Sequence, residues 1–171
     1  MNNKSLSPVS TAREVLKVLQ DAEKFCLPID VDFLCKYYEI RILYVDFSSM
    51  ENKIKKEIAG AIQKHDEKFT ILVNDNDSEV RARFTIAHEL GHYHLHMKDA
   101  PGKIITSFRR DQSKRETQAN QFAAELLMPR KLIEREYHKM VIPVSDTLAK
   151  KFNVSKPAMR IRLDNLGLMY V

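Results

Sequence analysis

The stretch Arg83–His96, RFTIAHELGHYHLH, contains four of the six histidines of this 171-residue chain. Residues 88–92 within it, HELGH, have the pattern H-E-x-x-H. On an α-helix, positions i and i+4 lie about 40° apart on one face, so His88 and His92 can reach one tetrahedral cation. Glu89 can then take a proton from water at the metal instead of binding the metal itself.

The alternative interpretation of this stretch is a solvated helix whose histidines are scattered by chance. At this composition, random placement would give the pattern in about one of seventy such chains. The apolar residues of the stretch also predict a substantially buried helix: Phe84, Ile86, Ala87 and Leu90. Two buried imidazoles without a shared partner would be costly, so the sequence favours a metal site.

A catalytic zinc site needs a third protein ligand and one open position, and the helix predicted at 113–128 offers the best donor. Glu116 and Asn120 are four residues apart and share one face of it. We expect Glu116 to bind the metal and Asn120 to hydrogen-bond a ligating imidazole. Glu125, nine residues beyond Glu116, should face the opposite side. The alternative for Glu116 is an ordinary first-turn acid, favoured by the helix dipole.

Helical angles also sort the other residues of the opening stretch. His94 lies about 120° from His88 and is expected to be solvated. His96 lies about 80° from His88, so it could line the rim of the site and stabilise an oxyanion, although solvent exposure is the simpler expectation. Tyr93 is a weaker candidate for the same role.

Hydrophobic periodicity predicts a mixture of helices and strands, and therefore an α+β fold. The predicted helices cover residues 11–25, 29–40, 79–96, 113–128 and 131–140. The predicted strands cover residues 40–47, 58–64, 68–75 and 104–108, with a hairpin turn between the second and the third.

The last part of the chain has a pattern of its own, which predicts two helices within residues 145–169. A tight turn at Asn153-Val154 separates them, Ser155 caps the second helix and Gly167 ends it. This arrangement resembles a helix-turn-helix unit, whose second helix can enter a major groove. We therefore divide the chain into a domain that carries the predicted metal site, 1–140, and a C-terminal helix-turn-helix-like segment, 141–171.

The charge of the C-terminal segment makes DNA binding possible but weak. Its basic residues Lys156, Arg160 and Arg162 are expected to project away from the core, opposite an apolar side. A single unit with so small an excess of charge would bind weakly and with strong salt dependence. The net charge of the whole chain, +5, is also compatible with nucleic acid without indicating it. Packing on the core or protein recognition is the favoured role.

Composition places the protein among ordinary globular proteins, with 44% hydrophobic and 30% charged residues. No apolar run of about eighteen residues predicts a membrane span. The start, MNNKSLSPVS, lacks the apolar core of a signal peptide, so a cytoplasmic location is expected. Cys26 and Cys35 are accordingly expected to be free thiols.

Two motifs together, RFTIAHELGHYHLH and ETQANQFAAELLMP at residues 116–129, resemble the ImmA/IrrE family of metallo-endopeptidases. The resemblance covers roughly residues 29–129. It implies a small twisted sheet packed on zincin-like helices, with Zn2+ (or Mn2+) held by His88, His92 and Glu116 and with Glu89 as the base. Members of the family often carry an acid where this chain has Gln118; such a ligand would displace Glu116.

The resemblance further implies a zinc endopeptidase that cuts one regulatory protein, typically a DNA-binding repressor with a helix-turn-helix. Such an anti-repressor would release the genes of a mobile element or stress response. An extended substrate could pair with a strand edge at 69–73. The alternative is a DNA- or protein-binding regulator with a structural or vestigial metal site. Glu89 distinguishes the peptidase from the regulator, because a structural metal site needs no base beside its ligands.

Overall fold

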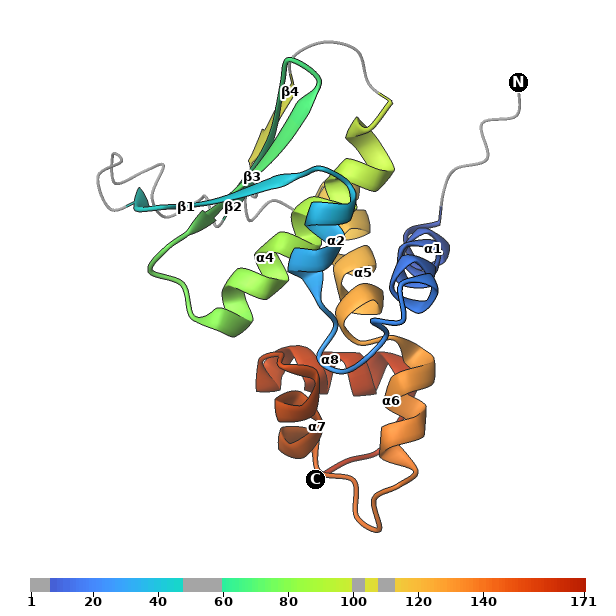
Figure 1. The fold of residues 1–171 in the computed structure, drawn as a ribbon. Helices are drawn as coiled ribbons and strands as arrows, with labels where there is room; N and C mark the ends of the chain where they lie inside the picture. The colour runs from blue at the N-terminus through green and yellow to red at the C-terminus, as the bar shows by residue number, and fades with distance from the viewer. Residues whose placement is uncertain (1–6, 48–59, 100–103, 108–112) are drawn as a thin grey trace.

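The computed structural model describes residues 7–47, 60–99, 104–107 and 113–171, and it confirms the predicted α+β class (Figure 1). Its helices and strands begin and end within a few residues of the predicted bounds. In chain order they are α1 (Pro8–Asp21), α2 (Val31–Tyr37), β1 (Arg41–Val45), β2 (Gly60–His65), β3 (Lys68–Asn74), α4 (Glu79–His92), the π-helix η2 (Tyr93–Met97), β4 (Ile104–Ser107), α5 (Lys114–Leu127), α6 (Arg130–Tyr137), α7 (Ser145–Phe152) and α8 (Lys156–Leu166).

Strands of the described residues form one sheet in the order β1-β3-β2-β4. β3 pairs in parallel with β1 and antiparallel with β2, and β2 pairs antiparallel with β4. Asp66 and Glu67 make the predicted hairpin turn with φ of 48° and 61°. The expectation that residues 69–73 form a strand edge is wrong, because β3 already has a partner on both sides. Local pattern predicts a strand but not its place in the sheet.

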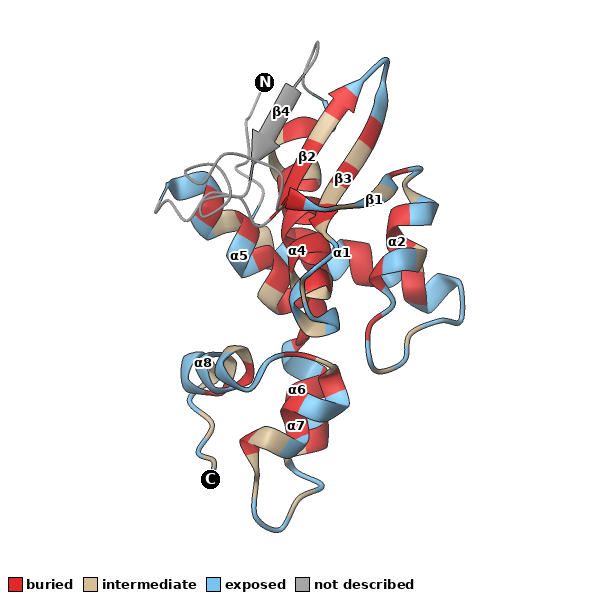
Figure 2. Ribbon diagram, turned by 90° about the vertical axis from the view of Figure 1, so that its left-hand side faces the viewer, coloured by how far each residue is buried: buried red, intermediate tan, exposed pale blue. Residues whose placement is uncertain are grey.

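The sheet packs on α4, α4 packs on α5, and α1 covers the far side of α5 (Figures 1 and 2). Every residue from Thr85 to His92 is buried, which excludes the solvated-helix interpretation. Gly60 permits the contact between β2 and α4, because a Cβ on this residue would lie 2.3 Å from Thr85 Cγ2. The helix with the two histidines is therefore the centre of the molecule, between the sheet and the other helices.

The C-terminal helices α7 and α8 have the predicted turn and caps. Asn153 ends α7 in the left-handed conformation with φ of 51°, and the Ser155 hydroxyl accepts the Ala158 N–H to begin α8. Gly167 ends α8 with φ of 69°. Met159 and Leu163 are fully buried, so the predicted apolar side of α8 is the side that packs.

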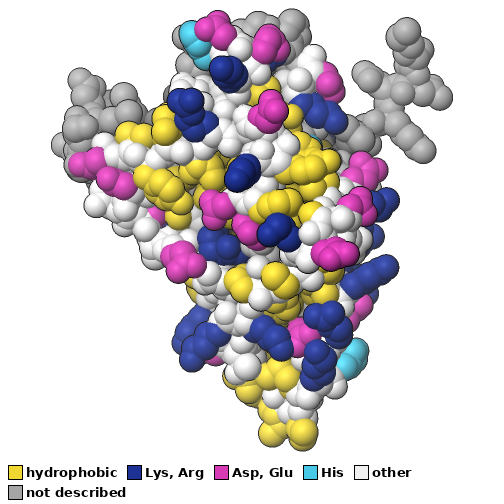
Figure 3. Space-filling model, in the orientation of Figure 1, with side chains coloured by type: hydrophobic (Ala, Val, Ile, Leu, Met, Phe, Trp, Pro, Cys, Tyr) yellow, Lys and Arg dark blue, Asp and Glu magenta, His cyan; other side chains and the backbone are white. Residues whose placement is uncertain are grey.

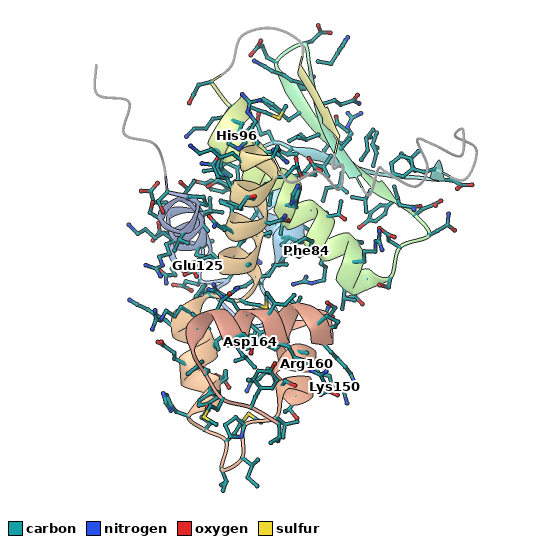
Figure 4. The ribbon with its side chains drawn as sticks, turned by 180° about the vertical axis from the view of Figure 1, so that it is seen from behind. Phe84, His96, Glu125, Lys150, Arg160 and Asp164 are labelled. Carbon is teal, nitrogen blue, oxygen red and sulfur yellow. The ribbon has the colours of Figure 1, made fainter. Side chains whose placement is uncertain are left out.

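Arg162 does not project from α8, contrary to expectation. Its side chain is 11% exposed, pairs with the buried carboxylate of Glu125 on α5, and donates to the Met128 carbonyl at 3.0 Å. Figure 4 shows Glu125 at the lower part of α5. A helical wheel could not identify this partner because it comes from a distant part of the sequence. Ile161 points outward instead and is 61% exposed.

The surface agrees with the mild positive charge. Figure 3 shows lysines and arginines on the lower part of one face, where the C-terminal helices lie, with acidic side chains among them. Cys26 is exposed, Cys35 is buried, and both are free, as expected. No helix within the described residues has the length and apolarity needed to cross a membrane.

Candidate metal centre

Side chains from α4 and α5 converge at one buried point. The Nε2 atoms of His88 and His92 lie 3.0 Å apart. The Glu116 carboxylate closes the triangle, with Oε2 at 3.1 Å from His88 Nε2 and Oε1 at 2.9 Å from His92 Nε2. The possible ligand atoms of these residues all lie within 4.8 Å of one another, and all three side chains are buried.

The start of α5 brings Glu116 to the cluster. Ser113 caps the helix by accepting the Glu116 N–H at 3.3 Å, so that Glu116 stands in the first turn. Gln118, two residues on and therefore about 200° round the helix from Glu116, is half-buried. Glu125 is buried at the other side of α5, where Arg13 and Arg162 pair with it, as its angular distance from Glu116 predicts.

Gly91, the fourth residue of the HELGH motif, sets the distance between the two helices. A Cβ on it would lie 3.1 Å from Ala119 Cα and 3.2 Å from Phe122 Cδ1 on α5. Only a residue without a side chain allows this crossing unchanged. This role was not predicted from the sequence. A glycine inside an otherwise good helical pattern was the available signal.

Asn120 fixes the orientation of the first imidazole. Its Oδ1 lies 2.9 Å from His88 Nδ1. An amide oxygen can only accept, so the Nδ1–H of His88 donates this bond and Nε2 keeps its lone pair toward the cluster. A contact between Asn120 and an imidazole was expected from the sequence, and in metal sites a bond of this kind orients the ligating ring.

Glu89 lies beside the cluster, fully buried between α4 and β2. Its carboxylate oxygens form no well-aligned hydrogen bond with the described residues, although the Ile62 backbone amide lies near them. Burial first, and then the nearby Glu116 carboxylate, raise the pKa of Glu89 well above its usual value, and the Ile62 backbone amide acts in the opposite direction. A buried carboxylate without a well-aligned hydrogen bond is costly, so this position is suited to a ligand or a reacting water.

The chemistry of these residues fits a divalent metal ion. Two imidazoles and one carboxylate are the donor set of many catalytic zinc sites, which leave one position open. Burial, and then the neighbouring His88, lower the pKa of His92 to about 4. The ring is therefore neutral at physiological pH, which is the form that binds metals.

The helix changes after His92, where η2 widens the turn, and the expectation for His94 is wrong. This side chain is buried, stacks on Phe122 at 5.8 Å between ring centroids, and meets Tyr38 edge-on at 4.6 Å. Its burial lowers its pKa to about 4. The prediction failed because it assumed that the face away from His88 is solvated, whereas α2 and α5 supply packing partners there.

His96 and Tyr93, the two candidates for the rim, lie in different surroundings. The His96 ring is 5.6 Å from the His92 ring, and its buried Nε2 has no hydrogen-bond partner in the described part of the chain. Figure 4 shows His96 at the upper end of this helix. Tyr93 packs on Phe69 at 4.9 Å and on Tyr38 at 6.0 Å between centroids. Of the two candidates, His96 is the one whose ring lies beside the cluster.

The small sheet, the buried H-E-x-x-H helix and the carboxylate of the following helix are typical of zincin-like metallopeptidases. The model of the IrrE N-terminal-like domain, peptidase family M78, matches residues 35–164, and the chain belongs to this family. The match extends through α7 into α8. The metallopeptidase ImmA of Bacillus subtilis (strain 168) is 29% identical over 110 residues, which are 64% of this chain and 65% of that protein. The resemblance inferred from the two motifs is thus confirmed, and the aligned part is just under two thirds of the relative.

Proposed function

We propose that this protein is a zinc-dependent endopeptidase, with manganese as the alternative ion, and that His88, His92 and Glu116 bind the metal. The convergence of two imidazole Nε2 atoms and one carboxylate supports this proposal most directly. The buried Glu89 carboxylate beside them adds a group for proton transfer. A purely structural site would not need such a group.

The residues have separate roles in the proposed reaction. A bound metal ion supplies Lewis acidity, which lowers the pKa of water and polarises a peptide carbonyl. Glu89 accepts the proton of the attacking water and later gives it to the leaving amine. Asn120 holds His88 in its ligating orientation, and His96 donates a hydrogen bond at the rim to the developing oxyanion.

An extended substrate needs a strand with a free edge. Because β3 has a partner on both sides, β4 is the candidate strand for this pairing. β4 pairs with β2, and β2 lies against Glu89. Among the described strands β4 has no second neighbour. Backbone pairing with β4 would carry the substrate along the sheet toward the cluster.

The proposed substrate is one regulatory protein, such as a DNA-binding repressor with a helix-turn-helix, whose cleavage would relieve repression in a mobile element or stress response. Family membership and the similarity to a metallopeptidase named ImmA support this choice. The C-terminal segment, 141–171, would serve protein recognition and packing.

Ion pairs within the chain support that role over DNA binding. They engage Lys151 with Glu136, Lys156 and Arg160 with Asp146, and Arg162 with Glu125. A DNA-binding surface instead needs positive charge that is free to displace counterions at phosphates.

The proposal is tested with Glu89→Gln, which keeps the shape of the side chain but removes the base. The zinc-loaded variant should keep the metal content and circular dichroism of the wild type and lose cleavage of the substrate repressor, for which any repressor encoded by a neighbouring gene is the first candidate. Glu67→Gln, at a side chain that is 83% exposed, is the control and should cut like the wild type. Full activity of Glu89→Gln in the host would instead favour the alternative, a binding regulator with a structural metal.

A further inference from the structure

A groove lies where α8 meets α4 and α5. It consists of two adjoining pockets of about 440 and 410 Å³, which share Phe84, Ala158 and Ile161. Val154 extends the apolar wall at one end, and the polar side chains of Thr117, Gln121 and Asn165 line the other. Figure 4 shows Phe84 on α4, above α8. Pockets of this size are typical of ligand sites.

The groove begins where the metal cluster ends. Phe84 is one helical turn before His88 on the same face of α4, and the two ring centroids are 6.3 Å apart. Asn120 lines the second pocket and also bonds His88 Nδ1. The near end of the groove is therefore about one turn of α4 from His88.

We propose that the groove binds the substrate polypeptide and seats one of its large apolar side chains between Phe84 and Ile161; this rests on the proposed peptidase function. Along α4, Phe84 lies about 6 Å from His88 and about 12 Å from His92. An extended chain advances about 3.3 Å per residue. The seated side chain therefore stands about two to four residues from the bond that is cut. In this way α8 supplies a wall that selects the substrate.

The lining of the groove fits a polypeptide and not a phosphate backbone. Ile161 is 61% exposed, and covering its side chain is favourable. The side-chain amides of Gln121 and Asn165 can donate and accept hydrogen bonds, as the main chain of an extended peptide requires. Both arginines of the lining are already paired, Arg81 with Asp77 and Arg162 with Glu125.

A display library of random linear peptides, selected against the zinc-loaded full-length Glu89→Gln protein, tests this proposal. The Glu89→Gln change keeps bound peptides uncut. The selection is repeated with Ile161→Glu added, and separately with Ile142→Glu. Ile142 is the matched control, because it is 64% exposed and lies outside the groove. Ile161→Ala, compared by thermal unfolding, separates loss of the apolar contact from loss of fold.

Enrichment of peptides with leucine, isoleucine, methionine or phenylalanine at one fixed position is expected. Ile161→Glu should weaken the best peptide by about tenfold or more, Ile161→Ala should weaken it less, and Ile142→Glu should not change it. Absence of enrichment, or enrichment that is indifferent to Ile161→Glu, would overturn the proposal.

Cleavage of the enriched peptides by the protein with Glu89 intact distinguishes this inference from the proposed function. Peptides that are cut but bind independently of Ile161 would refute the groove and leave the peptidase function standing. Peptides that depend on Ile161 for binding, yet are never cut, would show a peptide-binding groove that does not present substrate to the cluster, and would overturn the proposal.

Discussion

Gly91 of α4 lies directly against Ala119 of α5, so close that a Cβ on residue 91 would come within 3.2 Å of the Ala119 carbonyl oxygen. This contact sets the spacing between the helix that carries both imidazoles and the helix that carries Glu116 and Asn120. Metal binding should therefore depend on a residue that offers no ligand atom.

Replacing Gly91 with alanine should lower zinc affinity on the order of tenfold, because α5 must move by a few tenths of an ångström. The free energy of unfolding should fall by about 0–2 kcal/mol, since overpacking costs about 1–3 kcal/mol while the helix propensity of alanine returns about 1 kcal/mol. Titration against a competing chelator measures the affinity, and urea unfolding measures the stability. Gly167→Ala is the control for zinc affinity, because nothing lies within 4 Å of the place that its methyl group would take. Equal zinc affinity in both variants would contradict the prediction.

Asn120→Ala should weaken zinc binding about tenfold to a hundredfold, because the His88 ring loses the acceptor that orients it. Asn120→Asp keeps an oxygen acceptor and should restore most of the affinity. Gln118→Ala, on the same helix but outside the cluster, should bind zinc like the wild type. If Asn120→Asp binds as poorly as Asn120→Ala, the hydrogen bond to Nδ1 is not the reason for the loss.

Arg162→Met should destabilise the protein by about 3 kcal/mol, because it leaves the buried Glu125 carboxylate without its best-buried partner. Arg13 also pairs with Glu125, but its side chain is 55% exposed and compensates only in part. Adding Glu125→Leu to Arg162→Met should recover part of the loss. Arg160→Met breaks an exposed pair with Asp146 and should cost less than about 1 kcal/mol. Equal losses from the two arginine variants in urea unfolding would argue against a special role for Arg162.

Glu136 should make the free energy of unfolding depend on pH in the acid range. Hydrogen bonds from Lys139, and then from Lys151, lower the pKa of this buried carboxylate to about 2. Because the folded pKa lies below the unfolded one, the stabilisation is complete above about pH 5 and is lost as the pH falls toward 2. It amounts to at most about 3 kcal/mol, reduced by screening at the half-exposed lysines.

Urea unfolding between neutral pH and pH 2 measures the effect of Glu136, and Glu136→Gln should have a shallower loss of stability with acid. Glu134→Gln, next to it on α6 but more exposed, is the control. If the wild type and Glu136→Gln lose stability in parallel, other carboxylates cause the acid sensitivity.

The arrangement within each of the two helices could be predicted from sequence, because each of these pairs spans one helical turn. The pairs His88–His92 and Glu116–Asn120 are both i and i+4, and a regular α-helix keeps such pairs on one face. The α-helix does not continue past His92, where η2 changes the number of residues per turn. The angles calculated from His88 for a regular α-helix therefore do not give the directions of the His94 and His96 side chains.

Other features could not be predicted because they depend on partners far away in the sequence. The pattern of residues 68–75 indicates a strand equally well at the centre or the edge of a sheet. The pattern of α8 alone predicts that Arg162 faces solvent, because its partner, Glu125, lies on α5. Phe84 looked like an ordinary core residue, and only α8 turns its ring into the wall of a groove.

One carboxylate ties together segments that are nearly the whole chain apart. Glu125 pairs with Arg13 on α1 and with Arg162 on α8. If either helix detaches, the buried Glu125 carboxylate keeps one arginine partner in place of two, so its interaction with the other helix changes as well. The first and last helices should for this reason melt together, as parts of one cooperative transition, and a shortened version lacking one of them would not report the native strength of the other.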